Sequence, residues 1–237
     1  MKSASKGVAM LVLIGFLAIL TLGTAWILDV GPFTSTDRGP VIATVDGRPI
    51  RLSDARSRVT TLAGVHTGQE GPLASEDWQD QVLESLVDDQ LIQAEAERRA
   101  ILVTAQELAD SVQEVVGMFP SLTDYETWLR SQGMDQDEVE RRLELQLLSA
   151  RVYEAVTADV EVSEEQVRAY YAANPGEFAT GDGDATPFGD VRSEIESRLL
   201  GQAKDAAFNS WLDEQRSAAD VEIVMTDWWG AIDEQQS

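Results

Sequence analysis

Apolar and polar side chains alternate in VIATVDGRPI, residues 41–50, until Asp46-Gly47 interrupts the pattern. Alternation predicts a strand with one buried face, and Asp-Gly is a favoured two-residue hairpin turn. A lone strand pair is unstable in water, so it needs a further partner. The other run of β-branched residues, VEIVM at residues 221–225, is the expected third strand. The pattern therefore predicts a small β-sheet that joins the two ends of a domain spanning residues 41–225.

Between these strands, apolar residues recur every three or four positions, which indicates amphipathic helices. Each helix is preceded by a residue that can cap its first turn, and several have Glu or Gln three positions later, as in a capping box. The expected capping residues are Ser75, Thr104, Thr123, Asp135, Ser163 and Thr186, the last followed by Pro187 at the first helical position. Two of the expected apolar stripes are Val139, Leu143, Leu147 and Ala150, and Val191, Ile195, Leu199, Ala203, Ala207 and Trp211. The fold class is predicted to be mainly α.

The beginning of the chain predicts a transmembrane helix. Lys2 and Lys6 precede an uncharged, mainly apolar run over residues 7–28. At about 1.5 Å per residue, a helix of this length crosses a hydrocarbon core of about 30 Å. We therefore expect residues 7–28 to enter a membrane.

The charge distribution around this segment predicts its orientation. The positive-inside rule keeps residues 1–6 in the cytoplasm and places residues 29–237 on the extracytoplasmic, periplasmic side of the inner membrane. A signal peptide cleaved near Ala25 is the alternative. The apolar run continues beyond that position, so a single-pass signal anchor is favoured. Residues 29–40 are then a tether, and residues 226–237 form a C-terminal tail.

Composition narrows the function further. Of the 237 residues, 42 are acidic and 18 basic, which gives a formal net charge of -24. A surface with this charge repels phosphate backbones, so no nucleic-acid partner is expected. The chain has no cysteine, which excludes disulfides and thiolate sites. Its one histidine, His66, has no second histidine with which to form a metal site or a relay. We expect no metal, no cofactor and no catalytic residue.

Adjacent carboxylates occur at Asp88-Asp89, Glu164-Glu165 and Asp213-Glu214. Neighbouring residues of a helix point about 100° apart, so such pairs do not converge on one substrate atom. We expect them to form solvated helix faces.

The order of these segments resembles the SurA N-terminal-domain family of exported chaperones, shared by SurA, PrsA and PpiD-like proteins. Each matching block alone is a weak signal, because it is a strand pair or a capped amphipathic helix. The combination of five blocks in family order carries the resemblance. The blocks are VIATVDGRPI (41–50), residues 81–112, residues 125–152, VEVSEEQVRAYYAANPGEF (160–178) and residues 187–223.

The resemblance also implies where this chain departs from its relatives. In that family, the segment similar to residues 160–178 leads into a parvulin domain, a prolyl isomerase module of about a hundred residues, and the segment similar to residues 187–223 follows it. Here only ATGDGDAT, residues 179–186, separates Phe178 from Pro187. A linker of this length cannot contain such a domain, so we expect a chaperone module that is not an enzyme.

The resemblance implies a membrane-anchored, ATP-independent holdase that binds unfolded or nascent exported proteins. A peptidyl-prolyl isomerase and a membrane-docked accessory subunit remain alternatives. The second is suggested by Trp228 and Trp229, which could pack on the domain, lie at the membrane or bind a partner. Client binding needs adaptable apolar and aromatic surface, although core packing is the competing interpretation. The candidate client-binding residues are Met118, Phe119, Tyr125, Trp128 and Leu129, with Tyr170, Tyr171 and Phe178 as a second group.

Overall fold

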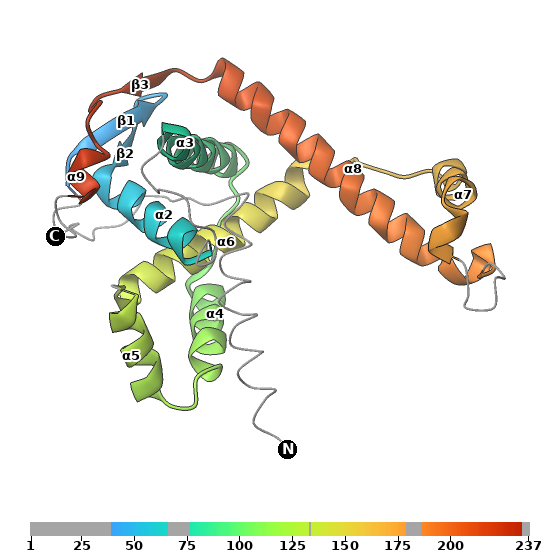
Figure 1. Cartoon of the computed structure of the whole chain (residues 1–237), viewed down its shortest axis with the longest axis horizontal. Coiled ribbons are helices and arrows are strands. Elements are labelled where there is room, and N and C mark those ends of the chain that lie inside the picture. The colour runs from blue at the N-terminus through green and yellow to red at the C-terminus, as the bar shows by residue number, and fades with distance from the viewer. Residues whose placement is uncertain (1–38, 66–75, 133, 179–185, 234–237) are drawn as a thin grey trace. The chain divides into compact units, whose positions relative to one another are not determined.

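The computed structural model describes residues 39–65, 76–132, 134–178 and 186–233 (Figure 1). The chain divides into two compact units. Unit 1 comprises the described residues up to Val152 together with those from Arg216 onward, and unit 2 comprises Tyr153–Gln215.

The described residues are mainly helical, as the sequence predicts. In chain order the elements are β1 (Val41–Val45), β2 (Arg48–Arg51), α2 (Leu52–Val65), α3 (Glu76–Arg98), α4 (Ala105–Gly117), α5 (Leu122–Ser131), α6 (Gln136–Val156), α7 (Glu164–Ala173), the 3-10 helix η2 (Pro175–Phe178), α8 (Phe188–Ala218), β3 (Val221–Ile223) and α9 (Gly230–Asp233).

The small sheet has the predicted strands. Its order is β2-β1-β3, both pairings are antiparallel, and Thr44 lies opposite Glu222. Asp46 and Gly47 both have positive φ, 50° and 78°, as a type I′ turn requires. The sheet therefore joins residues near the two ends of the chain, which confirms the prediction made from residues 41–50 and 221–225.

The core of unit 1 lies between this sheet, α2 and α3. The sheet contributes Ile42, Val45 and Ile50 to it, and α3 contributes Val82 and Leu86, all of them fully buried. Three residues close to the C-terminus complete this core: Trp228, Trp229 and Ile232. The two indole rings contact each other edge to face with centroids 5.3 Å apart. Of the alternatives for the tryptophan pair, the structure shows packing on the domain.

Helix α2 was not predicted from the sequence. It buries Leu52, Ala55 and Val59 against the sheet and α3, and it also buries the charged side chain of Arg58. Leu52, Ala55 and Val59 do recur every three or four positions, as in an amphipathic helix, but the charged Arg58 lies beside them on the buried face and weakens that signal.

Two of the predicted helix starts are shifted. Thr104 and Ser163 form the expected capping boxes with Glu107 and Gln166. The predicted box at Thr123 is wrong, because α5 begins two residues earlier with Ser121 as its cap. Similarly, α8 begins at Phe188, so Pro187 precedes the helix instead of being its first residue. The carbonyl of Pro187 accepts a hydrogen bond from the backbone N–H of Asp190 in the first turn.

Two predicted apolar stripes differ from the buried faces. In α6, Leu147 is half-buried and Ala150 is exposed, whereas Leu145, Leu148 and Val152 are buried with Val139 and Leu143. In α8, the buried residues are Ile195, Phe208 and Leu212, and the rest of the predicted stripe is half-buried. Helix α6 contributes to more than one core, since Leu145 belongs to the core of the sheet and Leu143 to that of α4 and α5.

Unit 2 has its own small core, formed by Val167 of α7, Phe178 of η2 and Ile195 of α8. The backbone N–H of Thr186 donates to the carbonyl of Phe178 at 2.7 Å, so the two residues that flank the segment 179–185 lie together in unit 2. The hydroxyl of Tyr171 donates to the carbonyl of Thr186 at 2.7 Å and fixes the same point.

No helix in the described ranges is both long and apolar enough to cross a membrane. The predicted membrane segment 7–28, the tether as far as residue 38, and His66 lie outside these ranges.

Candidate functional site

Helices α4 and α5 form a hairpin in unit 1, and Figure 1 shows the two side by side with a short connection between them. We call residues 105–131 the hairpin and Met118–Leu122 its tip. Val115, Tyr125 and Leu129 form the buried centre of the hairpin with Val139 and Leu143 of α6. The hairpin is thus a small helical layer with a core separate from that of the sheet.

Three aromatic rings pack together beside the tip. The ring centroid of Phe119 lies 5.4 Å from that of Tyr125 and 5.3 Å from that of Trp128. Tyr125 and Trp128 stack with their centroids 6.2 Å apart. These separations are in the range at which aromatic pairs attract one another, so the rings fix the angle between the two helices.

The tip itself presents apolar side chains to solvent. Met118 is 51% exposed and Leu122 is 65% exposed. Neither belongs to the buried centre of the hairpin. The packed rings connect the tip to α5, and the exposed side chains are accessible to another molecule.

The predicted site residues of the hairpin therefore divide into two sets. Tyr125 and Leu129 are buried and support the fold, whereas Phe119 and Trp128 are half-buried and Met118 is exposed. Tyr125 also donates its hydroxyl to Oε1 of Gln136 at 2.9 Å, and burial raises the pKa of this phenol. Whether these residues contact a client stays a prediction.

Leu122 was missed by the sequence reasoning. The signal that could have found it is Ser121, whose hydroxyl accepts from the backbone N–H of Asp124 and makes Leu122 the first residue of α5. A leucine at a first helical position has no preceding turn to pack on, which makes it a candidate for an exposed apolar contact.

The base of the hairpin is held by charged groups. Glu107 accepts from the hydroxyl and the backbone N–H of Thr104 and pairs with Arg151 of α6. The Thr104 hydroxyl, the Thr104 N–H and the Arg151 guanidinium together lower the pKa of Glu107 to about 2. Arg151 also donates to the carbonyl of Leu102, so the start of α4 is tied to α6 at two points.

The second predicted group lies in unit 2. Phe178 is buried in the core of that unit, and Tyr171 packs on it with ring centroids 5.1 Å apart. The hydroxyl of Tyr170 lies 3.1 Å from the carboxylate of Glu177, and both accept from the guanidinium of Arg198. The predicted site residues Tyr170, Tyr171 and Phe178 thus hold unit 2 together. They form no exposed apolar surface comparable with the tip.

A further exposed apolar group accompanies β3. It consists of Val221, Ile223 and Val224 at the edge of the sheet. Leu102, before α4, is a separate exposed leucine.

The expectation that Asp88-Asp89 form a solvated face is wrong. Asp89 is only 1% exposed and pairs with Arg58, which is 6% exposed. Asp88 pairs with Arg216 at 2.5 Å, and burial raises the pKa of its carboxyl while Arg216 opposes that rise. Both carboxylates are engaged in ion pairs within unit 1. The described part of the chain contains no cluster of side chains that could hold a metal ion.

Residues 1–153 match the family described as SurA-like N-terminal domain. The chain belongs to this family. The match includes β1 to α5 and most of α6, and therefore the whole hairpin, whereas Tyr170, Tyr171 and Phe178 lie beyond it. Within this SurA-like chain, the hairpin is the candidate site that the family domain itself contains.

A solved structure supports the fold of this SurA-like chain. It comes from work on the virulence factor PEB4 and the periplasmic protein Cj1289, described as two structurally related SurA-like chaperones of Campylobacter jejuni. The two chains are 12% identical, the TM-score is 0.54, and the match covers 78% of this chain and 99% of the other. No curated protein matches the sequence.

Proposed function

We propose that this SurA-like chain is an extracytoplasmic, ATP-independent chaperone that binds unfolded exported polypeptides at the tip of the hairpin. The observation that carries the proposal is the pair of exposed apolar side chains, Met118 and Leu122, held on a hairpin whose own core is filled. The structural likeness to proteins described as SurA-like chaperones agrees with it.

The physical basis of binding is apolar burial. Each Å² of apolar surface removed from water contributes about 25 cal/mol, so a small, shallow tip gives weak contacts with each client. Methionine is flexible and polarisable, which suits a surface that accepts many sequences. Weak, adaptable contacts dissociate without a nucleotide-driven step, which is why we propose a holdase.

The proposal includes no prolyl isomerase activity. The eight residues 179–186 between Phe178 and Pro187 support this part of the proposal, because a parvulin module needs about a hundred residues. A coupled assay on a prolyl tetrapeptide tests this part, and catalysis at low protein concentration would contradict it. A role as a docked accessory subunit loses its supporting observation, because Trp228 and Trp229 are in the core of unit 1.

Leu122 and Leu102 provide a matched test of the site. They are exposed to 65% and 64%, but only Leu122 is at the tip. We expect Leu122→Ser to weaken suppression of aggregation of several unrelated unfolded proteins about threefold or more, and Met118→Ser with Leu122→Ser to abolish it, because apolar contact area is removed.

The control is Leu102→Ser, which should suppress aggregation like the unsubstituted chain. Far-UV circular dichroism of all variants should remain unchanged, since exposed substitutions alter stability little. Equal losses in Leu122→Ser and Leu102→Ser, or full activity of the double variant, would show that the tip is not the client site.

We further propose that residues 7–28 anchor the chain in the membrane with the hairpin outside the cytoplasm. The uncharged run after Lys2 and Lys6 supports this orientation. The full chain should stay with the membrane after alkaline carbonate extraction, whereas a chain starting at residue 29 should be released. Release of both would remove the anchor from the proposal.

A further inference from the structure

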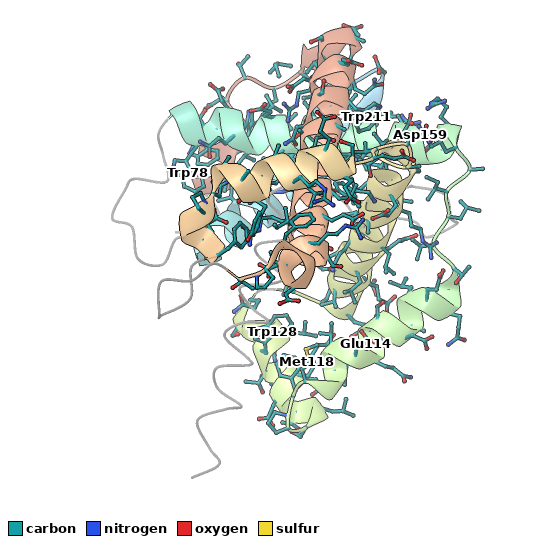
Figure 2. All side chains as sticks on the ribbon, turned by 90° about the vertical axis from the view of Figure 1, so that its right-hand side faces the viewer. Trp78, Glu114, Met118, Trp128, Asp159 and Trp211 are labelled. Carbon is teal, nitrogen blue, oxygen red and sulfur yellow. The ribbon has the colours of Figure 1, made fainter. Side chains whose placement is uncertain are left out.

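Each exposed apolar residue of the tip has an acidic residue one helical turn away. Glu114 lies in α4, four positions before Met118, which is the C-cap of that helix. Glu126 lies in α5, four positions after Leu122. Residues four apart lie on one helix face, with Cβ atoms about 5–6 Å apart. Both carboxylates belong to exposed residues, and Figure 2 labels Glu114 and Met118 in the hairpin with Trp128 from α5.

Neither carboxylate is neutralised by an ion pair in the part of the chain that the structure describes, unlike several other glutamates of the molecule. Glu107, Glu138 and Glu164 each pair with arginine, whereas no ion pair involves Glu114 or Glu126 among the residues that the structure describes. Helix α4 contains no basic residue. Arg130, the basic residue of α5, donates to the backbone carbonyl of Glu126 and to the hydroxyl of Thr127. Glu114 and Glu126 therefore place negative charge beside the exposed apolar side chains of the tip.

We propose that the tip selects unfolded segments in which an apolar side chain is flanked by lysine or arginine. This inference rests on the proposed chaperone function and specifies the client of the same site. The apolar side chain contacts Met118 or Leu122, and the cationic side chain approaches Glu114 or Glu126. Charge complementarity of this kind acts on the rate of encounter and on the choice of partner.

The spacing predicts where the cation stands in the client. In an extended segment, residues i and i+2 lie on one face about 6.6 Å apart, at about 3.3 Å per residue. This spacing is close to the separation of the apolar and acidic positions on each helix of the hairpin. A lysine or arginine two positions from a leucine or phenylalanine is therefore the expected recognition pattern.

Three labelled peptides test the selection directly. They share the same apolar residues and carry lysine, glutamine or glutamate two positions away from each. With the full chain in detergent micelles, fluorescence anisotropy at low salt should show the lysine peptide binding at least tenfold more tightly than the glutamate peptide. The difference should shrink at about 0.5 M salt, where charges are screened within a few Å.

A pair of matched variants separates the tip from the overall charge. Glu114→Gln with Glu126→Gln should make the lysine and glutamine peptides bind alike while the glutamine peptide keeps its affinity. Glu161→Gln with Glu165→Gln removes the same charge from exposed positions in unit 2 and should leave the discrimination intact.

Each outcome bears on one proposal. Equal binding of all three peptides, with binding lost in Leu122→Ser, would overturn the cationic preference and leave the chaperone site standing. Equal effects of the two glutamine pairs would also overturn it, because the overall field would then be responsible. A different result would overturn the proposed function instead: no peptide binds, and Leu122→Ser suppresses aggregation of unfolded proteins as well as the unsubstituted chain does.

Discussion

Arg58 and Asp89 form an ion pair that is almost completely shielded from water. Removing a charge from water is expensive, so a buried pair adds little stability relative to an apolar pair of the same size. Losing one partner is different, because the remaining charge stays buried without its counterion. The pair joins α2 to α3 and therefore helps to hold α2 in position.

We expect Asp89→Ala to lower the free energy of unfolding by about 3–5 kcal/mol, because it removes the buried carboxylate that faces Arg58. Urea unfolding of the full chain measures this loss. The matched control is Glu194→Ala, which removes one of the partners of Arg198 on an exposed face of α8 and should change the free energy by less than about 1 kcal/mol. Equal, small effects of the two substitutions would show that Arg58 does not depend on Asp89.

The lowered pKa of Glu107 predicts that the stability of the fold depends on pH. Its carboxyl pKa is lowered to about 2 from 4.5, chiefly by the Thr104 hydroxyl. A lowered pKa in the folded state contributes stability above the unfolded value near 4.5, and this contribution is lost as the pH falls toward 2. Glu107→Gln keeps a side chain that can cap Thr104 but removes the charge. Its melting temperature should lie below that of the unsubstituted chain at about pH 7, and the difference should narrow between about pH 5 and pH 3.

The second capping box supplies the control for this prediction. Gln166 caps Ser163 without a charge, so the effect of Gln166→Ala should not vary over the same pH range. A constant difference between Glu107→Gln and the unsubstituted chain down to pH 3 would contradict the role of the charge.

Short-range polar signals were the residue-scale features that the sequence could predict. Thr104 and Ser163 were identified because their partners lie three positions away in the chain. The box at Thr123 was wrong because Ser121 with Asp124 offers the same chemistry two residues earlier, and spacing alone does not choose between them. Asp89 was expected to be solvated because its partner, Arg58, is 31 positions away in a helix that was not predicted.

At the scale of elements, the β1–β2 hairpin depends on its turn. Gly47 has φ of 78°, a conformation that costs other residues about 1–2 kcal/mol. Gly47→Ala should lower the free energy of unfolding by about that amount, measured by urea titration. Gly117→Ala, in the last turn of α4, meets no atom within 4 Å and should be neutral or slightly stabilising. Similar losses from both substitutions would indicate that the turn geometry is not the cause.

For most of the amphipathic helices, the sequence predicted the helix better than its buried face. Helix α4 packs in one core, in which Val115 is buried and Leu108 and Val112 pack against it. Helix α6 sends Leu143 to one core and Leu145 to another, so no single period describes it. The candidate site follows the same rule. Met118 was identified because it lies in a cluster of apolar and aromatic residues. The burial of Tyr125 and Leu129 depends on α6, whose position the sequence pattern does not give.

At the scale of the whole molecule, the net charge of -24 sets a condition on stability. Like charges repel one another in the compact state, and salt screens them over a Debye length of about 8 Å at 0.15 M ionic strength. The surface ion pairs weaken with salt as well, but each contributes little. We therefore expect the melting temperature to rise between about 20 mM and 500 mM sodium chloride. A fall would show that the ion pairs outweigh the net repulsion.

The sheet has a consequence for the order in which the protein can be completed during synthesis. Ala43 of β1 pairs with Ile223 of β3, and Trp228 closes the core beneath them. At about 5–20 residues per second, the roughly 180 residues between Ala43 and Ile223 take about 10–35 seconds to synthesise. During that interval Ile42, Val45 and Ile50 have no third strand or indole to cover them. Until β3 and Trp228 have been synthesised, the growing chain is itself an unfolded polypeptide with apolar surface in need of protection.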